Sequence, residues 1–491
     1  MIRHPVHGLY EGLRHGADRI ALIQENQSLT YGQLVARTEA AAADLIARGI
    51  KAGDRVGLCA ANSIDHVVAH LAMLRIGAVW TPLNPRNGPS LNAQFAQRAG
   101  LSLTLYDAAS REALSPDGPR LMIDDWRPHG ASTCLPAISD APDAEFALKF
   151  TGGSTGVPKG VIQSLRSAAA AFRSLVDFYG FTPLDVNLCV APLTHGAIHY
   201  LLPVLAKGGC HVILAQPDRD QILSALRSQV TVAFMPPTLI YLLLESGDFG
   251  PEDFSRLRSL TYSAAPMSPA RIEQVIARFG PVLSTLYGLT EAPMAISSLR
   301  PDDMAQPERR ASVGRLFAQT PVALLTTEGQ VIRHQGEGEI LVGGDLAATH
   351  YLDAPDANAA ARHEGWLKTG DIGRLDAEGY LTLIGRSKEI IISGGYNIYP
   401  VEVEAALSAH PAVREVCAFG VDDDLWGERL EAVAVLDDPT VSPADLTLFV
   451  RNSLGPVRTP KTLHLLPSLP RNPVGKVVRS QVKSLIYPAH Q

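Results

Sequence analysis

The chain has 491 residues, of which 46% are hydrophobic and 19% charged, and its formal net charge at pH 7 is −7. This composition excludes a disordered or fibrous protein, and the length allows about two to four domains. The slight acidic excess gives no support to nucleic-acid binding, and no apolar run is long enough to span a membrane.

The sequence shows no sign of export. The opening segment, MIRHPVHGLYEGLRHG, lacks the apolar core of a signal peptide. The five cysteines form no CxxC pair and no metal-ligand spacing, which favours free thiols in a reducing compartment. We therefore expect a cytoplasmic protein.

The first part of the chain alternates between helical and strand-like patterns. Helical patterns at 33–48 and 64–76 are each followed by an apolar run, at 55–60 and 78–83. Such alternation indicates an α/β sheet. A segment rich in Pro, Ser and Asp, 107–144, is expected to be a surface connection.

The alternation resumes with a strand at 146–150 and a helix at 163–179, and it changes near residue 380. The last part is expected to contain these elements: helix (401–409), strand (413–421), strand (429–436), helix (443–454) and strand (462–466). We predict a large α/β domain of mixed sheets flanked by helices, 1–385, and a small α+β lid joined to it by a hinge, 386–491.

A glycine-rich segment, TGGSTGVPKG from Thr151 to Gly160, carries the strongest chemical signal. Its glycines let backbone amides approach phosphate oxygens, while its hydroxyls and Lys159 add donors and charge. Flexible loops share this composition, but Pro-Lys-Gly directly after it favours phosphate binding. The segment is no Walker A loop, and the chain has no dinucleotide fingerprint, which weakens kinase-like and dehydrogenase-like functions.

Three residues elsewhere are candidates for the same site, each with an ordinary alternative. Glu291, in LYGLTEAP, suggests a Mg²⁺ ligand, because a carboxylate beside phosphates needs a cation between them; alone it would be a solvated loop acid. Asp371, in KTGDIG, could accept ribose hydroxyls or be an ordinary turn aspartate. Lys476, taken alone, would be a solvated surface lysine.

These segments together resemble the superfamily of adenylate-forming enzymes, which includes acyl-CoA synthetases, peptide-synthetase adenylation domains and beetle luciferases. The resemblance runs from LTYGQL at 29–34, through GRSKEIIISGGYN at 385–397, to NPVGK at 472–476. Five motifs in order are far more specific than any one of them. The resemblance implies an acid–thiol ligase that uses ATP to form an acyl-AMP, releases pyrophosphate, and passes the acyl group to coenzyme A.

The resemblance also implies roles for the residues that match its motifs. The residues expected to bind ATP are Thr151, Ser154, Thr155, Lys159, Tyr287, Asp371 and Arg386. The residues expected to act in catalysis are Lys476, Thr290, Glu291 and His195, with Glu291 also holding Mg²⁺. Lys388 is expected at the hinge.

Four positions depart from the family pattern. Gly152 and Ser154 stand where Ser and Thr are usual, which removes one donor side chain from the loop. Ala264, in SAAPMS, replaces a more frequent glycine and would narrow the acid pocket or tilt its floor. Lys149 is an unusual charge in a strand position.

The residues leave the acyl acceptor open. The hairpin Ser393, Gly394, Gly395 is of the type found in CoA-using members, where glycine lets the pantetheine arm pass close to the backbone. Trp426 could stack on the CoA adenine or could be a packing residue of the small domain. A separate carrier protein is the alternative acceptor, and a nucleotide-binding sensor is disfavoured because every catalytic position is occupied.

The acid pocket is expected to be mostly apolar, without the arginine pair that suits a dicarboxylate. The segments that line it in the family contribute His195, Ile198, His199, Phe234, Met235, Ala264 and Met294. We expect an aromatic or medium-chain aliphatic acid.

Overall fold

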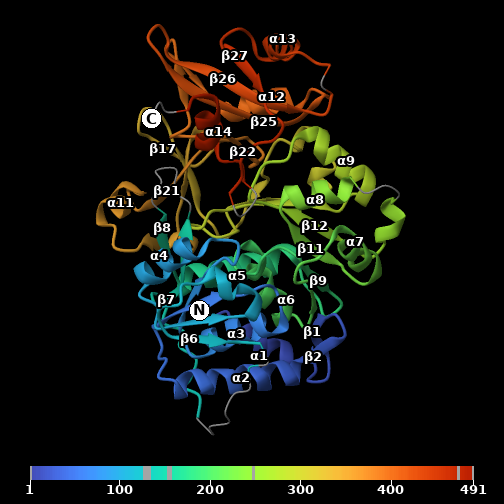
Figure 1. Ribbon diagram of the computed structural model, residues 1–491, viewed down its shortest axis with the longest axis vertical. Helices are drawn as coiled ribbons and strands as arrows, with labels where there is room; N and C mark the ends of the chain where they lie inside the picture. Colours follow the sequence, from blue (N-terminus) through green and yellow to red (C-terminus); the bar gives the residue numbers. More distant parts are fainter. Residues whose placement is uncertain are drawn as a thin grey trace.

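The computed structural model describes residues 3–124, 126, 134–151, 158–245, 249–438, 440–472 and 476–488. In Figure 1 a large body, the chain through Arg386, carries a smaller lid, in orange and red, that begins at Ile391. The predicted fold class is confirmed, because the body is mixed α/β and the lid is a small α+β unit.

The first large sheet of the body has the order β19-β8-β7-β4-β3-β5-β6. Its strands are β3 (Arg55–Cys59), β4 (Val79–Pro82), β5 (Leu103–Tyr106), β6 (Arg120–Met122), β7 (Glu145–Thr151), β8 (Lys159–Ser164) and β19 (Thr349–Tyr351). Strands β7 and β8 are antiparallel, with Thr151 opposite Lys159. The glycine-rich segment therefore joins two neighbouring strands, and β8 extends into the region where we predicted only a helix.

The second large sheet has the order β15-β14-β13-β12-β11-β9-β10-β1-β2. Its strands are β1 (Ile20–Gln24), β2 (Gln27–Thr30), β9 (Val186–Cys189), β10 (Cys210–Ile213), β11 (Val232–Met235), β12 (Ser259–Tyr262), β13 (Leu283–Tyr287), β14 (Ser297–Leu299) and β15 (Arg315–Leu316). The run from β1 to β13 is parallel. The carboxyl ends of these strands, where α/β sheets usually bind ligands, therefore lie along one edge.

Helices lie between the two sheets and around them. The helices of the body are α1 (His7–Leu13), α2 (Tyr31–Ala47), α3 (Ile64–Arg75), α4 (Pro89–Ala99), α5 (Leu165–Tyr179), α6 (Leu201–Ala206), α7 (Arg219–Ser228), α8 (Pro237–Leu244), α9 (Pro269–Phe279), α10 (Pro301–Met304) and α11 (Pro355–Ala360). Helix α3 contacts β1 of one sheet and β3 and β4 of the other. Their shared apolar core includes Leu22, Leu58 and Val67, all buried.

A third, antiparallel sheet completes the body. Its strands are β16 (Val322–Leu325), β17 (Val331–Ile332), β18 (Gly336–Val342), β20 (Arg362–His363), β21 (Trp366–Leu375) and β22 (Leu381–Arg386). The register of β21 and β22 places Asp371 opposite Arg386. Two residues 15 positions apart in the sequence thereby become neighbours.

The lid is a sheet with helices packed on it. Its elements are β23 (Ile391–Ser393), β24 (Tyr396–Ile398), α12 (Pro400–Ser408), β25 (Val413–Asp423), β26 (Gly427–Leu436), α13 (Pro443–Leu454), β27 (Thr462–Leu465) and α14 (Arg479–Ile486). The five elements predicted between 401 and 466 are all present, each within a few residues of its expected bounds. Helix α14, which has eight residues, was not predicted, although Val482, Leu485 and Ile486 lie at helical spacing and Val482 is buried.

Within the described ranges, no helix combines the length and the apolar character needed to cross a membrane. The cysteines carry free thiols. Cys59, Cys189 and Cys417 are buried, whereas Cys134 is exposed.

Candidate active site

Asp371 is the centre of a buried polar contact between the second large sheet and the antiparallel sheet. The Tyr287 hydroxyl, at the end of β13, donates to Asp371 Oδ2 at 2.7 Å. Arg386 Nε lies 3.0 Å from Asp371 Oδ1. Burial, and next the Asp371 charge, raise the pKa of Tyr287 well above its ordinary value, so the hydroxyl stays protonated and donates. Each Asp371 oxygen still has a lone pair for another hydroxyl donor.

Glu291 lies beside the phosphate segment. The Tyr351 hydroxyl, on β19, donates to Glu291 Oε1 at 2.9 Å, and Lys159 Nζ lies 4.8 Å from the centre of the Tyr351 ring. The Thr349 hydroxyl holds the Glu291 carbonyl at 2.7 Å, and the Gln163 amide holds the Thr290 carbonyl at the same distance. A cation and a carboxylate therefore flank one tyrosine at the end of the β7–β8 pair.

The phosphate segment is only partly within the described residues. The Thr151 hydroxyl donates to the Lys159 carbonyl at 3.4 Å across the base of the segment. The predicted ATP ligands Ser154 and Thr155, and the departure at Gly152, lie outside the described residues.

Lys476 comes from the lid and faces the Asp371 cluster. Its side chain is exposed to solvent, yet enough protein surrounds it that burial lowers its pKa. The Arg386 cation lowers that pKa further, while Glu389 and Asp371 act in the opposite direction. The charge of Asp371 in the body therefore acts on the ammonium group of Lys476 in the lid.

The residues predicted for the acid pocket do not all come together. Ile198, Phe234 and Met294 belong to one buried core cluster. A methyl group added at Gly196 would lie 3.0 Å from the Phe234 ring and 3.9 Å from Met294 Sδ, so these residues enclose Gly196. Met235 packs in a different cluster, because consecutive strand residues point to opposite faces of the sheet.

Two of these pocket residues have left-handed backbones. Ala264, just after β12, has φ 74°, and Met294 has φ 62°. A left-handed conformation costs a non-glycine residue about 1–2 kcal/mol. The glycine that is more frequent at the position of Ala264 would adopt this φ without that cost.

His195, at the expected pocket entrance, lies near two cations. Its Nδ1 is 2.9 Å from the Thr194 hydroxyl. Burial, followed by the Lys149 and Arg86 cations, lowers its pKa to about 4. The imidazole is therefore neutral at pH 7 and can accept a hydrogen bond.

The glycine hairpin forms the tip of β23 and β24. Gly394 and Gly395 have φ 58° and 81°, as a two-residue hairpin turn requires. The Gly394 amide donates to the Trp426 carbonyl at 2.8 Å. Trp426 packs on Gly394, is 42% exposed, and has Lys461 Nζ 4.8 Å from its ring centre, so it has both a packed and an open side.

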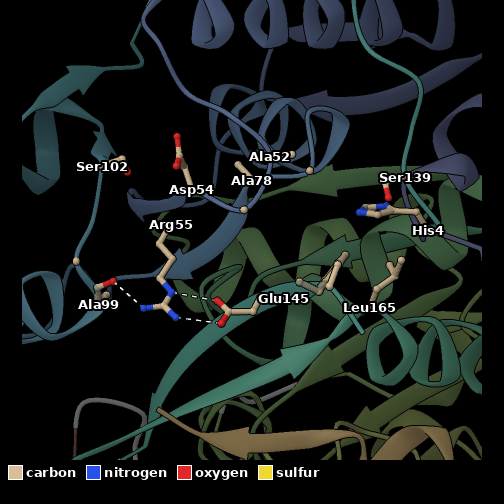
Figure 2. A pocket seen from close by; sticks show the side chains of 15 residues that line it. His4, Ala52, Asp54, Arg55, Ala78, Ala99, Ser102, Ser139, Glu145 and Leu165 are labelled. Carbon is tan, nitrogen blue, oxygen red and sulfur yellow. Dashed lines mark hydrogen bonds and ion pairs between the residues drawn. The ribbon is translucent and has the colours of Figure 1, made fainter. Parts of the chain in front are cut away.

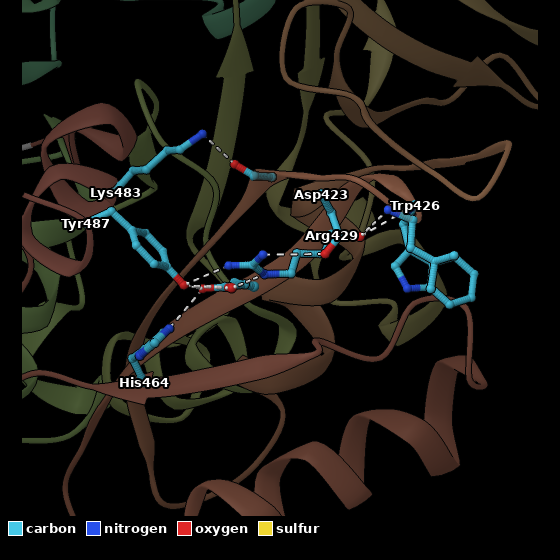
Figure 3. A network of polar contacts seen from close by, with 9 residues as sticks. Asp423, Trp426, Arg429, His464, Lys483 and Tyr487 are labelled. Atoms are coloured by element: carbon cyan, nitrogen blue, oxygen red, sulfur yellow. Dashed lines mark hydrogen bonds and ion pairs between the residues drawn. The ribbon is translucent and has the colours of Figure 1, made fainter. Parts of the chain in front are cut away.

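A polar network supports this end of the lid (Figure 3). Buried Glu431 accepts from Arg429 at 2.7 Å and from the Tyr487 hydroxyl at 2.7 Å, and it lies 2.9 Å from His464 Nε2. Asp423 accepts the Trp426 amide at 3.0 Å. The network connects the segment after β25 to the end of α14.

Lys388 lies in the link between β22 and β23 and is exposed. The Ser387 amide donates to the Gly370 carbonyl at 2.9 Å, which holds the start of the link on the body. Glu389 pairs with Arg479 of α14, which holds its end on the lid. The chain passes from body to lid within these few residues.

A separate hollow of about 650 Å³ lies where strands β3 and β7 of the first large sheet begin, whereas the phosphate segment follows the end of β7 (Figure 2). There Arg55, at the start of β3, makes a two-pronged contact with Glu145, at the start of β7, at 3.1 and 3.0 Å. None of the motif residues lines this hollow. The candidate site is therefore assigned from the motif residues and not from this hollow.

Comparison with known protein families identifies the family to which this chain belongs. The model of the AMP-binding enzyme family matches residues 10–352, and that of the AMP-binding enzyme C-terminal domain matches residues 402–476. This chain belongs to the AMP-binding enzyme family. The predicted relationship to adenylate-forming enzymes is confirmed.

Relatives within the AMP-binding family align over nearly the whole chain. The medium/long-chain-fatty-acid–CoA ligase FadD8 of Mycobacterium tuberculosis is 31% identical over 99% of this chain and 91% of its own length. The amide bond synthetase McbA of Marinactinospora thermotolerans has a TM-score of 0.88 at 28% identity, covering 98% of this chain and 99% of its own. The o-succinylbenzoate CoA synthetase of Bacillus subtilis, solved with ATP and a magnesium ion, has a TM-score of 0.85 at 29% identity, covering 97% and 99%.

Two residues of the candidate site were missed or not understood from the sequence. Nothing local marks Tyr351, which reaches Glu291 only because β19 pairs with β8 across nearly 200 positions. Lys149 was recognised as an unusual charge, but its partners were not predicted.

Proposed function

We propose that this chain uses ATP to convert a carboxylic acid into an acyl-AMP, with release of pyrophosphate, and then transfers the acyl group to coenzyme A. The observation that carries this proposal is the buried Asp371 cluster, with the Tyr287 hydroxyl at 2.7 Å and Arg386 Nε at 3.0 Å, whose charges act on Lys476 of the lid. A cation from a separate unit placed beside a hydroxyl-binding carboxylate suits a reaction at the α-phosphate.

In the first step, a carboxylate oxygen attacks the α-phosphorus, and the bond to the β-phosphate oxygen breaks. Asp371 would accept the ribose hydroxyls, and Tyr287 would lie against the adenine. Lys159 would neutralise the outer phosphates, and Lys476 would bridge the attacking carboxylate and the α-phosphate. Both reactants are anions, so positive charge positioned in advance lowers the barrier.

Magnesium fits the residues at the phosphate segment. Mg²⁺ in such sites takes one or two carboxylates and completes its shell with phosphates and water. Glu291 is a single carboxylate, with one oxygen bonded by Tyr351. When bound, Mg²⁺ supplies positive charge to the phosphate oxygens.

In the second step, the thiol sulfur of coenzyme A attacks the acyl carbon, and AMP leaves with its oxygen. The hairpin at Gly394 and Gly395 would let the pantetheine arm approach the backbone, and the open side of Trp426 would receive the adenine. Both substrates, ATP and coenzyme A, are metabolites of the cytoplasm, where we propose that the protein acts.

The test is acid-dependent exchange of labelled pyrophosphate into ATP by the purified full-length chain, without coenzyme A, across a broad acid library. We expect exchange with at least one acid, and AMP as the nucleotide product once coenzyme A is added. Lys476→Ala should abolish exchange, whereas Lys483→Ala, on α14 of the same lid, should not. ATP binding without exchange for any acid would favour a nucleotide sensor.

An amine is a second candidate acceptor of the acyl group. One observation supports it, the TM-score of 0.88 to an amide bond synthetase. The same purified chain, given ATP, Mg²⁺ and a good acid, should form a thioester with coenzyme A alone. Amide formation with a small amine but no thioester would establish an amine acceptor. Product that appears only after a carrier protein is added would establish the carrier alternative.

A further inference from the structure

Lys149 is a largely enclosed cation close to residues predicted for the acid pocket. It lies on β7, and its Nζ is 3.0 Å from His199 Nε2 and 4.9 Å from the centre of the Trp80 ring. Because burial lowers the pKa of His199 well below its ordinary value, the imidazole is neutral and accepts from the ammonium. One of the three N–H groups of Lys149 is used in this contact.

No carboxylate of the described residues pairs with Lys149. Lys149 lowers the pKa of three histidines, namely His70 on α3 and His195 and His199 around the turn before α6. Arg86 adds a further positive charge near His195. Burial lowers the pKa of Lys149 to about 7, because the contacts with His199 and Trp80 replace only part of its lost hydration and bring no negative charge.

The same short turn connects Lys149 to the acid pocket. His199 and Gly196 both belong to the turn Gly196–Tyr200; Gly196 is enclosed by Phe234 and Met294, while His199 contacts Lys149. Lys149, His195 and His199 each retain some accessible surface despite their depth. The protein therefore does not cover these three residues completely, and the turn places them close to the apolar residues predicted for the acid pocket.

We propose that Lys149 determines substrate specificity by binding a second carboxylate of the acid, remote from the carboxylate that is activated. The enzyme then prefers dicarboxylic acids to monocarboxylic acids of the same length. A buried cation is unfavourable without an anion, and the substrate supplies that anion. This inference rests on the proposed function, because it takes the pocket beside the turn as the acid site.

The charge of the surroundings favours an anion over other ligands. A hydroxyl group would satisfy the free N–H groups of Lys149 but would not neutralise its charge. An apolar chain end would leave both the charge and the donors unsatisfied, at a larger cost. The apolar residues Phe234, Ile198 and Met294 would then contact the part of the acid between its two carboxylates.

The experiment measures kcat/KM for pyrophosphate release with matched acids: adipic against hexanoic acid, terephthalic against benzoic acid, and the ω-hydroxy analogue of hexanoic acid. In the native protein, one diacid should exceed its monoacid by on the order of 10²-fold, because an unpaired buried charge costs that much. Lys149→Met should remove this preference through KM, so that the diacid and its monoacid are used equally. Lys149→Arg should retain part of it.

Two controls separate the possible failures. Lys207→Met, a lysine at the end of α6, should keep the native preference, and unfolding temperatures establish that each variant folds. Equal use of diacid and monoacid by the native protein, or a preference for the hydroxy acid, would overturn the role of Lys149 and leave acid activation intact. Equilibrium dialysis of labelled adipate and terephthalate covers the case of no turnover: diacid binding that Lys149→Met abolishes supports the inference although the proposed function fails, and no binding refutes it.

Discussion

Two lysines of this chain have lowered pKa values for different physical reasons. At Lys476, burial and the Arg386 cation together lower the pKa, and Glu389 and Asp371 partly compensate them. Lys149 is inside the body, and burial alone lowers its pKa to about 7. The first lysine has anionic partners in the protein, whereas the second lacks any among the described residues.

The stability of the protein should depend on pH through Lys149. Its ordinary pKa is 10.5 and its folded pKa is about 7, so between these values the unfolded chain binds a proton that the folded chain does not. The free-energy cost of Lys149 is therefore complete below pH 7 and disappears as the pH rises toward 10.5. Lys149→Met should raise the unfolding temperature most at or below pH 7, and the gain should vanish at high pH.

The difference in unfolding temperature between the native protein and Lys149→Met isolates the contribution of Lys149. Lys149 also lowers the pKa of His70, His195 and His199, so its removal raises the pKa of each imidazole, but burial keeps all three neutral in the folded protein above pH 7. The difference between pH 7 and pH 10 therefore reports Lys149. A thermal scan from pH 6 to 10 on native protein and variant measures it. A constant difference across the range would show that Lys149 contributes through packing and not through its charge.

Tyr351 gives a second prediction at this scale. Removing its hydroxyl by Tyr351→Phe leaves Glu291 without the donor that orients it. Groups that orient a metal ligand typically contribute about 10–100-fold to metal affinity. We expect the Mg²⁺ concentration for half-maximal pyrophosphate exchange to rise several-fold, with little change at saturating Mg²⁺. An unchanged Mg²⁺ dependence with a lower unfolding temperature would reduce Tyr351 to a packing role.

At the scale of elements, the β23–β24 hairpin combines a backbone constraint with a packing constraint. Gly394 and Gly395 both have positive φ, but only Gly394 lies against a side chain. A methyl group at Gly394 would lie 2.8 Å from Trp426 Cε3, whereas one at Gly395 would meet nothing within 4 Å. The two glycines are therefore a matched pair for separating the two constraints.

Both Gly394→Ala and Gly395→Ala should cost about 1–2 kcal/mol in the free energy of unfolding, because alanine resists a left-handed backbone. Gly394→Ala should cost more and should also raise the KM for coenzyme A, because it displaces Trp426. In the background of Trp426→Ala the additional cost at Gly394 should disappear, as a double-mutant cycle would measure. Equal effects on the KM for coenzyme A from both glycines would place the requirement in the backbone and not in Trp426.

At the scale of the whole molecule, the lid carries two features, Lys476 and the glycine hairpin, to which we assign different steps. In the present orientation Lys476 faces Asp371, while the hairpin residue Tyr396 is 61% exposed. One lid can hardly present both to one site at once, so we propose that the link 387–390 rotates between the two steps. A hinge of this kind must change φ and ψ substantially.

Proline at the hinge should trap one state. The Lys388 amide makes no hydrogen bond to any described residue, so Lys388→Pro removes rotation about φ without removing a contact. We expect pyrophosphate exchange to survive and thioester formation from synthetic acyl-AMP to fail. Lys476→Ala should do the reverse. Both half-reactions falling equally in both variants would contradict the alternation.

The sequence by itself determined the family, the fold class and the elements of the lid between 401 and 466, and it supplied the residues that we propose for the candidate site. These follow from local information: the spacing of apolar residues predicts a helix or strand, and a glycine-rich run or a motif such as LYGLTEAP has its meaning within a few residues. The prolines that begin α12 and α13 and the glycine that ends α13 are signals of this kind.

Only the tertiary structure decided which side chains meet. The β21–β22 register brings Arg386 to Asp371, the pairing of β19 with β8 brings Tyr351 to Glu291, and the turn before α6 brings His199 to Lys149. Met235 was separated from Phe234 for the same reason, because the face to which a strand residue points depends on what packs on each side. Such contacts join distant segments, and no pattern within one segment determines its partner or register.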